Sequence, residues 1–470
     1  MIVSSPKSRR VPAAVALVSI AILFASRSAQ AGNYESNFLS SDAALMAGAV
    51  TAITHDGGAV YYNPAGLGGL DRKEISLSGN AFMLRIRRTP DAYTTVLPSG
   101  TKTADLDTLD ILPIPSSMVL TRNITRKVTF GFGVFVPQFD TFSVTSSYSS
   151  RETFDAPAIT VDYAHRAEAI GKFQTYLVGP AVGWQIIRSF RLGFSLYAVY
   201  HVADDFNQFW AEGHTPLADG AGSPESQKLA FYESKSESTF FGMTATAGIQ
   251  WEFVRRFHLG AVLKAPVIAF YSLTKLNTAE TSAQAGMLFE PAVDFTHDER
   301  RVTRKLQMVM PLDAVLGFGY KTDDWGISAE ADYHPAMDNA AMAVRRTHVV
   351  NARLGASGAI SDHFALGGGL FTDRSYARET RGVASCKVHF YGATFGVSWN
   401  SSYALLRNSR SDALLFATSL VARYAIGHGE AGSVTFIPSF DKTVGRQIPG
   451  SADVIHHELS LHVGTGVYFW

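Results

Sequence analysis

The chain has 470 residues, of which 46% are hydrophobic and 17% charged, and its formal net charge is zero. This composition is too apolar for a disordered chain, and no basic excess points to nucleic-acid binding. A mean hydropathy of +0.06 is high for a soluble protein and low for a bundle of membrane helices. Such a value is expected when lipid-facing apolar residues alternate with polar residues that face a lumen. The single cysteine, Cys386, excludes an intramolecular disulfide.

The N-terminus has the three parts of a secretory signal peptide. Basic residues within the first ten positions precede an apolar run over 11–25, and Ala-Gln-Ala at 29–31 is a small-residue cleavage site. The apolar run is shorter than the roughly 20 residues of a membrane-spanning helix. We predict a signal peptide over 1–31 and a mature chain that begins near Gly32.

Residues 32–73 have no alternating pattern and are rich in alanine and glycine, especially over 43–49. A short helix followed by irregular chain is the natural interpretation. Irregular backbone cannot lie in lipid, because its polar groups would lack hydrogen-bond partners. We predict that this segment is a hatch, or plug, inside the lumen of the barrel formed by 74–470.

From residue 74 onward the dominant period is two, which is the period of a β-strand. Apolar residues at 241, 243, 245, 247, 249, 251 and 253 alternate with small or polar ones, and Trp325, Ile327 and Tyr333 alternate with Ser328, Glu330, Asp332 and His334. Most such segments reach the 9–11 residues of a tilted transmembrane strand. The pattern predicts an all-β, transmembrane antiparallel barrel of about 14 strands. The segments are 74–84, 114–122, 128–136, 173–187, 192–203, 239–253, 258–270, 302–320, 325–334, 349–360, 363–373, 387–399, 413–426 and 458–469.

The links between these segments alternate in length. The links 85–113, 137–172, 204–238, 271–301 and 427–457 are long and were expected to be outer loops, whereas 123–127, 188–191, 254–257, 321–324 and 361–362 are short. Outer-membrane barrels have short periplasmic turns and long outer loops. The link 400–412 is a long exception. The chain ends in an aromatic strand, Val467-Tyr468-Phe469-Trp470, as barrels inserted by the outer-membrane assembly machinery do.

The run from Gly48 to Leu67, which contains Asn63-Pro64-Ala65-Gly66, resembles the hatch signature of the FadL/TodX/OMPP1 family. Gly131–Pro137 is similar to the third strand of that family. Weaker similarities at 259–267, 310–313 and 354–373 follow in the same order. The resemblance implies a bacterial outer-membrane protein for passive uptake of hydrophobic compounds, either long-chain fatty acids or neutral hydrocarbons and aromatics. It implies no catalysis, no cofactor and no metal.

The resemblance also implies roles for single residues. Tyr34, Asn63, Pro64, Ala65 and Gly66 would belong to the hatch and its gating. Asn63 precedes a proline and is therefore held out of the helical region, so a rigid kink is expected there.

A kink in the third strand of the family opens the wall sideways, and Gly133, Val136 and Pro137 correspond to it. Because proline cannot donate to a ladder, we predict an unpaired gap near 133–140. The alternative is that Pro137 merely ends the strand.

Ligand capture was assigned to aromatic side chains in the expected outer loops, namely Phe139, Phe142, Phe206, Phe209 and Trp210. An interfacial girdle or packing between loops would explain the same residues. The expected partners are hydrophobic small molecules, outer-membrane lipid and, during biogenesis, the barrel assembly machinery, and the protein is expected to be a monomer. Family members bind carboxylates with basic residues, and nothing in the sequence selects among Lys172, Lys228 and Lys264.

The sequence leaves two alternatives to a transporter of hydrophobic compounds, a general diffusion porin and an outer-membrane hydrolase. A general diffusion porin would keep an open polar lumen, which the hatch-like segment argues against. An outer-membrane hydrolase would need a catalytic group such as His201 with Asp204 and Asp205, or His456 and His457 with Asp453. No nucleophile motif accompanies them, and adjacent histidines on a strand point to opposite faces, which disfavours a metal site.

Overall fold

The computed structural model describes residues 33, 37–155, 158–215, 226–286, 292–339, 344–378, 386–404, 413–438 and 445–469. The predicted signal peptide and Tyr34 lie outside these ranges. Three short helical elements, α2 (Ser41–Leu45), α3 (Ala59–Tyr62) and the 3-10 helix η1 (Pro64–Leu67), precede the strands. No helix among the described residues is long and apolar enough to cross a membrane.

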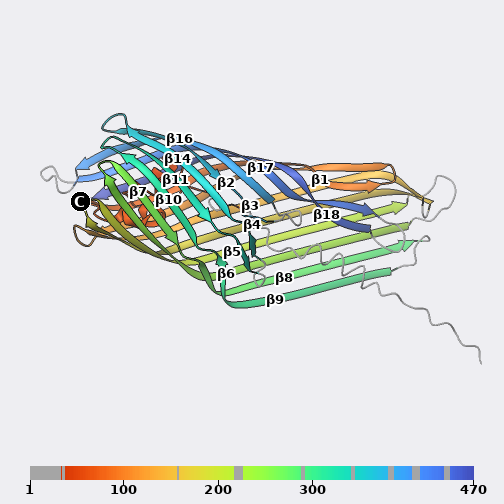
Figure 1. The fold of residues 1–470 in the computed structure, drawn as a ribbon. Helices are drawn as coiled ribbons and strands as arrows, with labels where there is room; N and C mark the ends of the chain where they lie inside the picture. The colour runs from red at the N-terminus through yellow and green to blue at the C-terminus, as the bar shows by residue number, and fades with distance from the viewer. Residues whose placement is uncertain are drawn as a thin grey trace, which may run out of the picture.

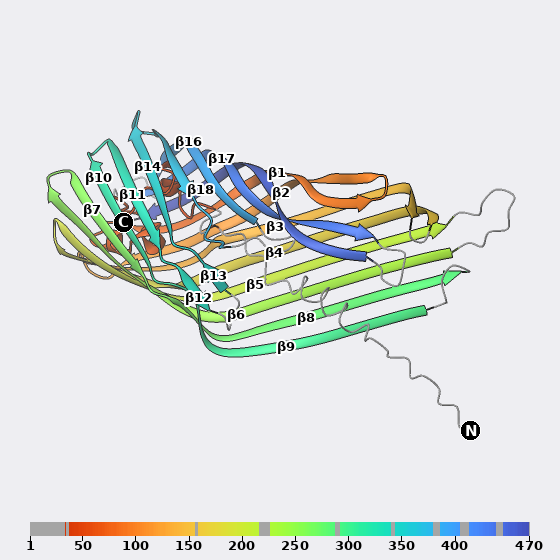
Figure 2. The ribbon, with the colours of Figure 1, turned by 45° about the vertical axis from the view of Figure 1, so that its right-hand side comes forward.

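The strands close into an antiparallel barrel (Figures 1 and 2). Its wall strands are β1 (Lys73–Leu97), β2 (Gly100–Asn123), β3 (Val128–Asp155), β4 (Ala158–Ile187), β5 (Phe190–Thr215), β6 (Ser226–Val254), β7 (Phe257–Lys264), β8 (Val267–Gly286), β9 (Ala292–Met310), β10 (Asp313–Lys321), β11 (Trp325–His334), β14 (Val349–Ala359), β15 (Phe364–Asp373), β16 (Cys386–Ala404), β17 (Ala413–Pro438) and β18 (Gly445–Phe469). A separate two-stranded sheet contains β12 (Met337–Asn339) and β13 (Val344–Arg346). β1 pairs with β18, which closes the ring.

The predicted count of 14 strands is confirmed, because two wall strands are each interrupted at a proline. β7 and β8 flank Pro266, and both pair with β6. β9 and β10 flank Pro311 and pair with β8 and β7 respectively. Since proline cannot donate to a ladder, the wall bends where the two prolines lie. Counting 302–320 as one strand was therefore correct.

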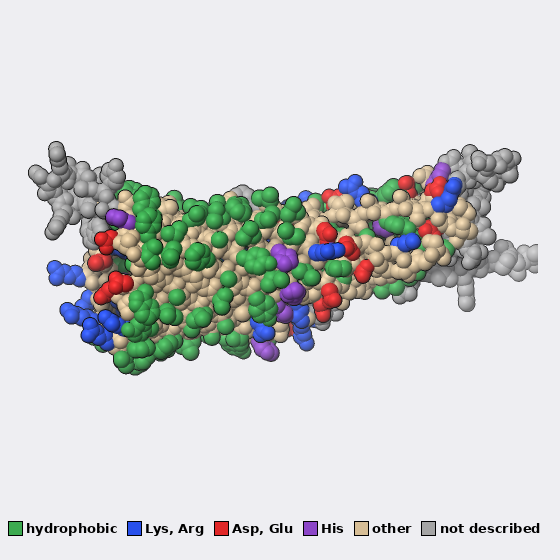
Figure 3. Space-filling model, turned by 90° about the horizontal axis from the view of Figure 1, so that it is seen from above, with side chains coloured by type: hydrophobic (Ala, Val, Ile, Leu, Met, Phe, Trp, Pro, Cys, Tyr) green, Lys and Arg blue, Asp and Glu red, His purple; other side chains and the backbone are tan. Residues whose placement is uncertain are grey.

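Side chains alternate across the wall as the sequence predicted. Phe241 and Trp251 of β6 and Tyr333 of β11 are exposed on the outside, whereas Glu330 and Asp332 are buried on the inside. Figure 3 shows the exposed hydrophobic side chains gathered in a band over one half of the long axis, with charged side chains on both sides of the band. Such a band marks the part of the barrel that lies in lipid.

The prediction of long outer loops was wrong. Most residues of these links belong to strands, namely in 85–113, 137–172, 204–238, 271–301 and 427–457. Figure 1 shows these long strands extending the wall away from the end that holds the N-terminal helices. We call this extension the outer arm. Inward and outward side chains still alternate in the outer arm, but the outward ones are polar. For example, buried Val144 is flanked by exposed Ser143 and Thr145. Outside the membrane the outer face need not be apolar, so the lipid-strand signature disappears although the strand continues.

Two buried apolar clusters fill the interior. One surrounds the N-terminal segment and includes Leu39, Val60 and Phe135. The other lies in the outer arm and includes Tyr163, Phe209 and Phe436. Phe436 lies near the end of β17, where residues 434–436 also pair in parallel with residues 93–95 of β1.

Candidate functional site

Residues 37–72, hereafter the hatch, lie inside the barrel at the end where short turns join the strands. The helix α2 begins at Ser40, whose hydroxyl accepts a hydrogen bond from the Ala43 amide at 3.2 Å. Such a cap satisfies one of the amides that have no partner within a helix. The hatch contacts strands on opposite sides of the ring, α2 on β14 to β18 and η1 on β3 to β6.

Asn63 fixes the turn between α3 and η1 and is completely buried. Its side-chain oxygen accepts from the Ala65 amide at 3.1 Å. Its side-chain amide donates to the Thr51 carbonyl at 2.8 Å and to the Ile249 carbonyl of β6 at 2.9 Å. Pro64 occupies the first position of η1, where its missing N–H costs nothing. The Asn-Pro-Ala-Gly motif thus joins the hatch to the wall.

Glycines on the inner face of the wall make room for this segment. A Cβ atom at these positions would collide with the hatch, because backbone or side-chain atoms of the hatch occupy its place. The contacts are Gly193 with Pro64, Gly248 with Asn63, Gly260 with Thr51 and Gly355 with Met46. The sequence showed these glycines only as the small-residue face of alternating strands, so their role as hatch contacts was missed.

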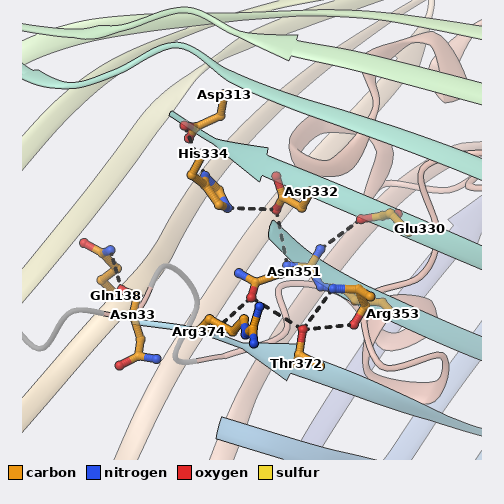
Figure 4. Close-up of polar contacts among 11 residues, drawn as sticks. Asn33, Gln138, Asp313, Glu330, Asp332, His334, Asn351, Arg353, Thr372 and Arg374 are labelled. Atoms are coloured by element: carbon orange, nitrogen blue, oxygen red, sulfur yellow. Dashed lines mark hydrogen bonds and ion pairs between the residues drawn. The ribbon is translucent and has the colours of Figure 1, made fainter. Parts of the chain in front are cut away.

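Charged side chains of the lumen form a second set of hatch contacts (Figure 4). Glu330 of β11 accepts from the Thr51 amide at 3.0 Å and pairs with Arg353 of β14 at 2.9 Å. Arg353 also lies 3.5 Å from Asp332. His334 bridges Asp332 and Asp313 of β10, at 3.3 and 3.1 Å. The buried acids are therefore compensated by neighbouring cations, as burial requires.

Asn33, which precedes the hatch, is hydrogen-bonded to strands on two sides of the lumen. Asn33 donates from its side-chain amide to the carbonyls of Asp373 and Val388, at 2.8 and 3.1 Å. The Asn33 carbonyl accepts from the Gln138 side chain of β3 at 3.1 Å. Figure 4 shows Asn33 beside Gln138. Asn33 thus lies against β3.

A small chamber of about 90 Å³ lies above the hatch. Tyr61 of the hatch forms part of its floor, and Pro137 and Gln138 of β3 form one side. Its remaining lining is mainly apolar with hydroxyl groups, together with Lys264 and His334. Of the three lysines considered from the sequence, Lys264 lines this chamber. Lys172 lies in a groove beside Tyr176 and Tyr200, and the side chain of Lys228 is not among those described.

The β2–β3 ladder ends at Ser117 and Phe135. Beyond this point β3 continues to pair with β4, with an irregularity between Phe135 and Gln138, while β2 continues to pair with β1. Among the described residues, 136–155 of β3 has no ladder partner on β2. We call this unpaired stretch of wall the seam. Gly133, Val136 and Pro137 lie at its lower end.

An apolar groove of about 580 Å³ opens on the wall at the lower end of the seam. Leu77 and Gly79 of β1, Met118 of β2, and Val134 and Val136 of β3 are among its lining residues. Leu77 and Met118 are exposed within the apolar band. The groove is formed where the ladders of β1 and β2 also shift register, so three irregular strands meet there.

Phe135 separates the seam from the hatch. Its ring is fully buried and lies 5.2 Å from Tyr61 of the hatch and 6.1 Å from Tyr197 of β5, measured between ring centroids. The ring occupies the place that a Cβ atom on Gly133 would take. Gly133 is therefore needed for this packing, a role that sequence reasoning did not foresee.

The aromatic residues named for capture lie on strands of the outer arm, not in loops. Phe142 and Phe209 are buried in its apolar cluster, where Phe209 lies 4.9 Å from Phe436. Phe139, Phe206 and Trp210 are only partly buried. Phe206 and Trp210 alternate with buried Phe209 and so point to the other face. The five residues are therefore not brought together on one surface.

The groups considered for a hydrolase are also separated. His201 is buried and stacks on Phe240 at 4.8 Å, and its Nδ1 lies 2.8 Å from the Thr175 hydroxyl. Asp204 lines the groove with Lys172, whereas Asp205 is buried. His456 is buried and His457 is partly exposed beside Tyr424. In the part of the chain that the structure describes, no cluster of three or more His, Cys, Asp or Glu residues suits a metal ion.

These features define a class of protein, a closed fourteen-stranded membrane barrel whose N-terminal segment is folded into its lumen. Sequence comparison gives the family: residues 22–335 match the profile of the outer membrane protein transport protein family (OMPP1/FadL/TodX). The chain belongs to this family. The predicted family, the bacterial outer-membrane location and the assignment as a transport protein rather than an enzyme are confirmed.

Individual relatives are distant. A putative outer membrane protein of Neisseria meningitidis serogroup B is 32% identical over 117 residues, which cover 24% of each chain. Among solved structures, a Pseudomonas aeruginosa FadL homologue has a TM-score of 0.53 at 13% identity, covering 92% of this chain and 99% of that one. The Ralstonia pickettii toluene transporter TbuX has a TM-score of 0.50 at 14% identity, covering 92% and 100%. These structural likenesses establish the fold.

Proposed function

We propose that the protein takes up hydrophobic compounds passively and releases them sideways through the seam into the membrane. The ligand would be captured by the outer arm, pass into the chamber above the hatch, and leave through the groove at the lower end of the seam. Exit into lipid suits a hydrophobic ligand, because transfer of apolar surface out of water is favourable.

The observation that carries this proposal is the coincidence of three features at one height of the wall. The β2–β3 ladder ends at Phe135, the apolar groove opens there on the outside, and Pro137 and Gln138 line the chamber inside. A barrier one strand thick therefore separates the chamber from the groove. The path straight down is filled by the hatch, which the wall holds through Asn63 and Glu330.

The chamber has to enlarge before it can hold a ligand. Its volume of about 90 Å³ is below the roughly 300–1,000 Å³ of ordinary ligand pockets. Asn33 accepts a hydrogen bond from Gln138, which lines the chamber, and donates to the carbonyls of Asp373 and Val388. We propose that displacement of Asn33, rather than of Asn63, Pro64, Ala65 and Gly66, admits the ligand.

The lining limits the chemistry of the ligand to hydrophobic compounds with at most a small polar end. Leu177, Val199, Val267 and Met310 supply apolar surface, and Lys264 supplies a cation. A long-chain fatty acid would place its carboxylate near Lys264, whereas a neutral hydrocarbon or aromatic compound would use the apolar surface alone. The toluene transporter among the structural relatives supports the second class.

A disulfide across the seam tests lateral exit. Ser116 of β2 and Val136 of β3 both line the groove. The double substitution Ser116→Cys and Val136→Cys, in a Cys386→Ala background, should therefore link β2 to β3 across the seam when oxidised. We expect uptake of a hydrophobic fluorescent probe to fall on oxidation and to recover on reduction. Ser78→Cys with Ser117→Cys is the matched control, because these residues already face each other on paired strands. Equal uptake by the oxidised and reduced seam pair would overturn the proposal.

A further inference from the structure

The two edges of the seam, β2 with β1 on one side and β3 on the other, are called its lips. Among the described residues no ladder joins the lips beyond Ser117 and Phe135, so side-chain contacts must hold them together. It runs upward from the last ladder pair, Ser117 and Phe135, to the tip of the arm. There the Ser99 amide and hydroxyl donate to Glu152 of β3, at 3.2 and 2.9 Å. Between these two points lie about fifteen residues of β3 without a β2 partner among the described residues.

Among the described residues, one ion pair crosses this interval on the inside of the wall. Arg85 of β1 donates through Nη1 to the carboxylate of Asp140 on β3. Asp140 lies two residues beyond Gln138, where β3 resumes regular pairing with β4. Both side chains are largely shielded from water, with relative exposures of 6% and 17%. Buried ion pairs are screened little by salt. Removal of one partner strongly destabilises the protein, because the other charge is left buried without compensation.

Arg85 is anchored on the opposite side by a second acid. Its Nε donates to Glu458 of β18 at 3.0 Å, and Glu458 also accepts from Arg423 of β17 at 2.9 Å. Those three strands are continuously paired with their neighbours at this height. Arg85 therefore lies on the side of the seam that is tied to β18 and β17, which we call the rigid lip. Asp140 lies on β3, which pairs with β4 but not with β2 at this height.

We propose that Arg85 and Asp140 form an ionic latch that holds the seam closed, with β3 as the moving lip. When the latch opens, Arg85 keeps Glu458 as a partner, so only Asp140 must find a new environment. Asp110 of β2, which is opposite Arg85 in the β1–β2 ladder, lies on the rigid lip as well. The consequence for transport rests on the proposed lateral exit, whereas closure of the seam does not.

Distances across the seam test the latch directly. Leu109 of β2 and Ser143 of β3 are both exposed, so spin labels at these positions in a Cys386→Ala background report the separation of the lips in lipid nanodiscs. We expect Asp140→Asn to move the distance distribution to longer values and to broaden it. Asp140→Glu, which keeps the charge, should restore the narrow distribution. Unchanged distances in Asp140→Asn would overturn the latch.

Arg423→Gln is the matched control. It removes an ion pair from the same cluster, but one that joins two strands already paired by their backbones. We expect the labelled distance to stay as in the wild type. If Arg423→Gln widens the seam as much as Asp140→Asn does, the cluster acts as a general support of the wall and the latch is refuted.

Uptake of a hydrophobic fluorescent probe separates the latch from the proposed function. If both are right, Asp140→Asn widens the seam and raises the uptake rate severalfold. A wider seam without faster uptake would keep the latch and reject lateral exit. Faster uptake with an unchanged seam would reject the latch and leave lateral exit to the disulfide experiment.

Discussion

Replacement of Asn63 by alanine should release the hatch from the wall. The substitution removes two donated hydrogen bonds and one accepted bond within a fully buried site. The Thr51 carbonyl keeps a second donor, the Gln250 side chain at 3.2 Å. The Ala65 amide loses the acceptor that its side-chain cap provided. The principal cost is therefore one buried donor left without its partner, together with the space vacated by the amide.

A buried donor without a partner costs about 1–3 kcal/mol, and the vacated space adds about 1 kcal/mol. A total of about 2–4 kcal/mol corresponds to a roughly 30- to 700-fold increase in hatch opening. Hydrogen exchange of peptides within 41–70, followed by mass spectrometry in nanodiscs, measures this opening. The barrel strands should keep their wild-type protection.

Asn351→Ala provides the control for that experiment. Asn351 is also buried in the lumen and accepts from the Arg374 amide at 2.8 Å, but the hydrogen bonds seen for it do not reach the hatch. Its exchange profile over 41–70 should match that of the wild type. Wild-type exchange over 41–70 in Asn63→Ala would show that the motif does not secure the hatch, and would refute the reasoning from its hydrogen bonds.

Other measurements follow from the same geometry. Gly193→Ala should expose the hatch to exchange, because its Cβ collides with hatch backbone, whereas Gly358→Ala, with no hatch atom near its Cβ, should not. Burial and nearby cations lower the pKa of His55 to about 3. Because only the unfolded chain takes up a proton on His55 between about pH 6.5 and pH 3, the free energy of unfolding is unaffected above pH 6.5. It falls on acidification, by about 1–2 kcal/mol at about pH 5. Asp56, whose pKa burial raises, acts in the opposite sense, so His55→Gln should show less acid-induced hatch exchange than the wild type at the same pH. Lys264→Gln should reduce uptake of a long-chain fatty acid and leave a neutral aromatic unaffected; equal losses for both would refute a carboxylate site. In planar bilayers the wild type should show no large steady conductance steps, which an open porin would show.

The sequence determined the barrel and its two faces. Lipid requires an apolar outer face, and successive side chains of a strand point to opposite faces. Residues such as Phe241 and Trp251 therefore predicted which side of β6 faces outward, and both are exposed in the structure. The family resemblance added the hatch motif. Pro137, whose nitrogen has no hydrogen to donate, lies two residues beyond the end of the β2–β3 ladder at Phe135.

The outer arm was missed for the converse reason. Beyond the membrane the outer face contacts water and does not have to be apolar. Serine and threonine occupy the outer positions of 143–150, as they do in loops. Strand formation there depends on pairing with neighbours distant in the chain, which local composition does not encode. Phe142 and Phe209 were consequently named as residues of loops, although they pack inside a sheet.

Only the tertiary structure decided which polar residues meet in the lumen. Arg85, Asp140 and Glu458 are spread over almost the whole chain. The sequence pattern placed Arg85 and Asp140 in expected outer loops and Glu458 at the start of the last predicted strand. Strand order and register bring them within hydrogen-bonding distance. The same holds for Gly193 and Gly248, which the sequence marks as small residues and the fold places against Pro64 and Asn63. Alternation along a strand is a local property, whereas contact across a barrel depends on closure of the whole ring.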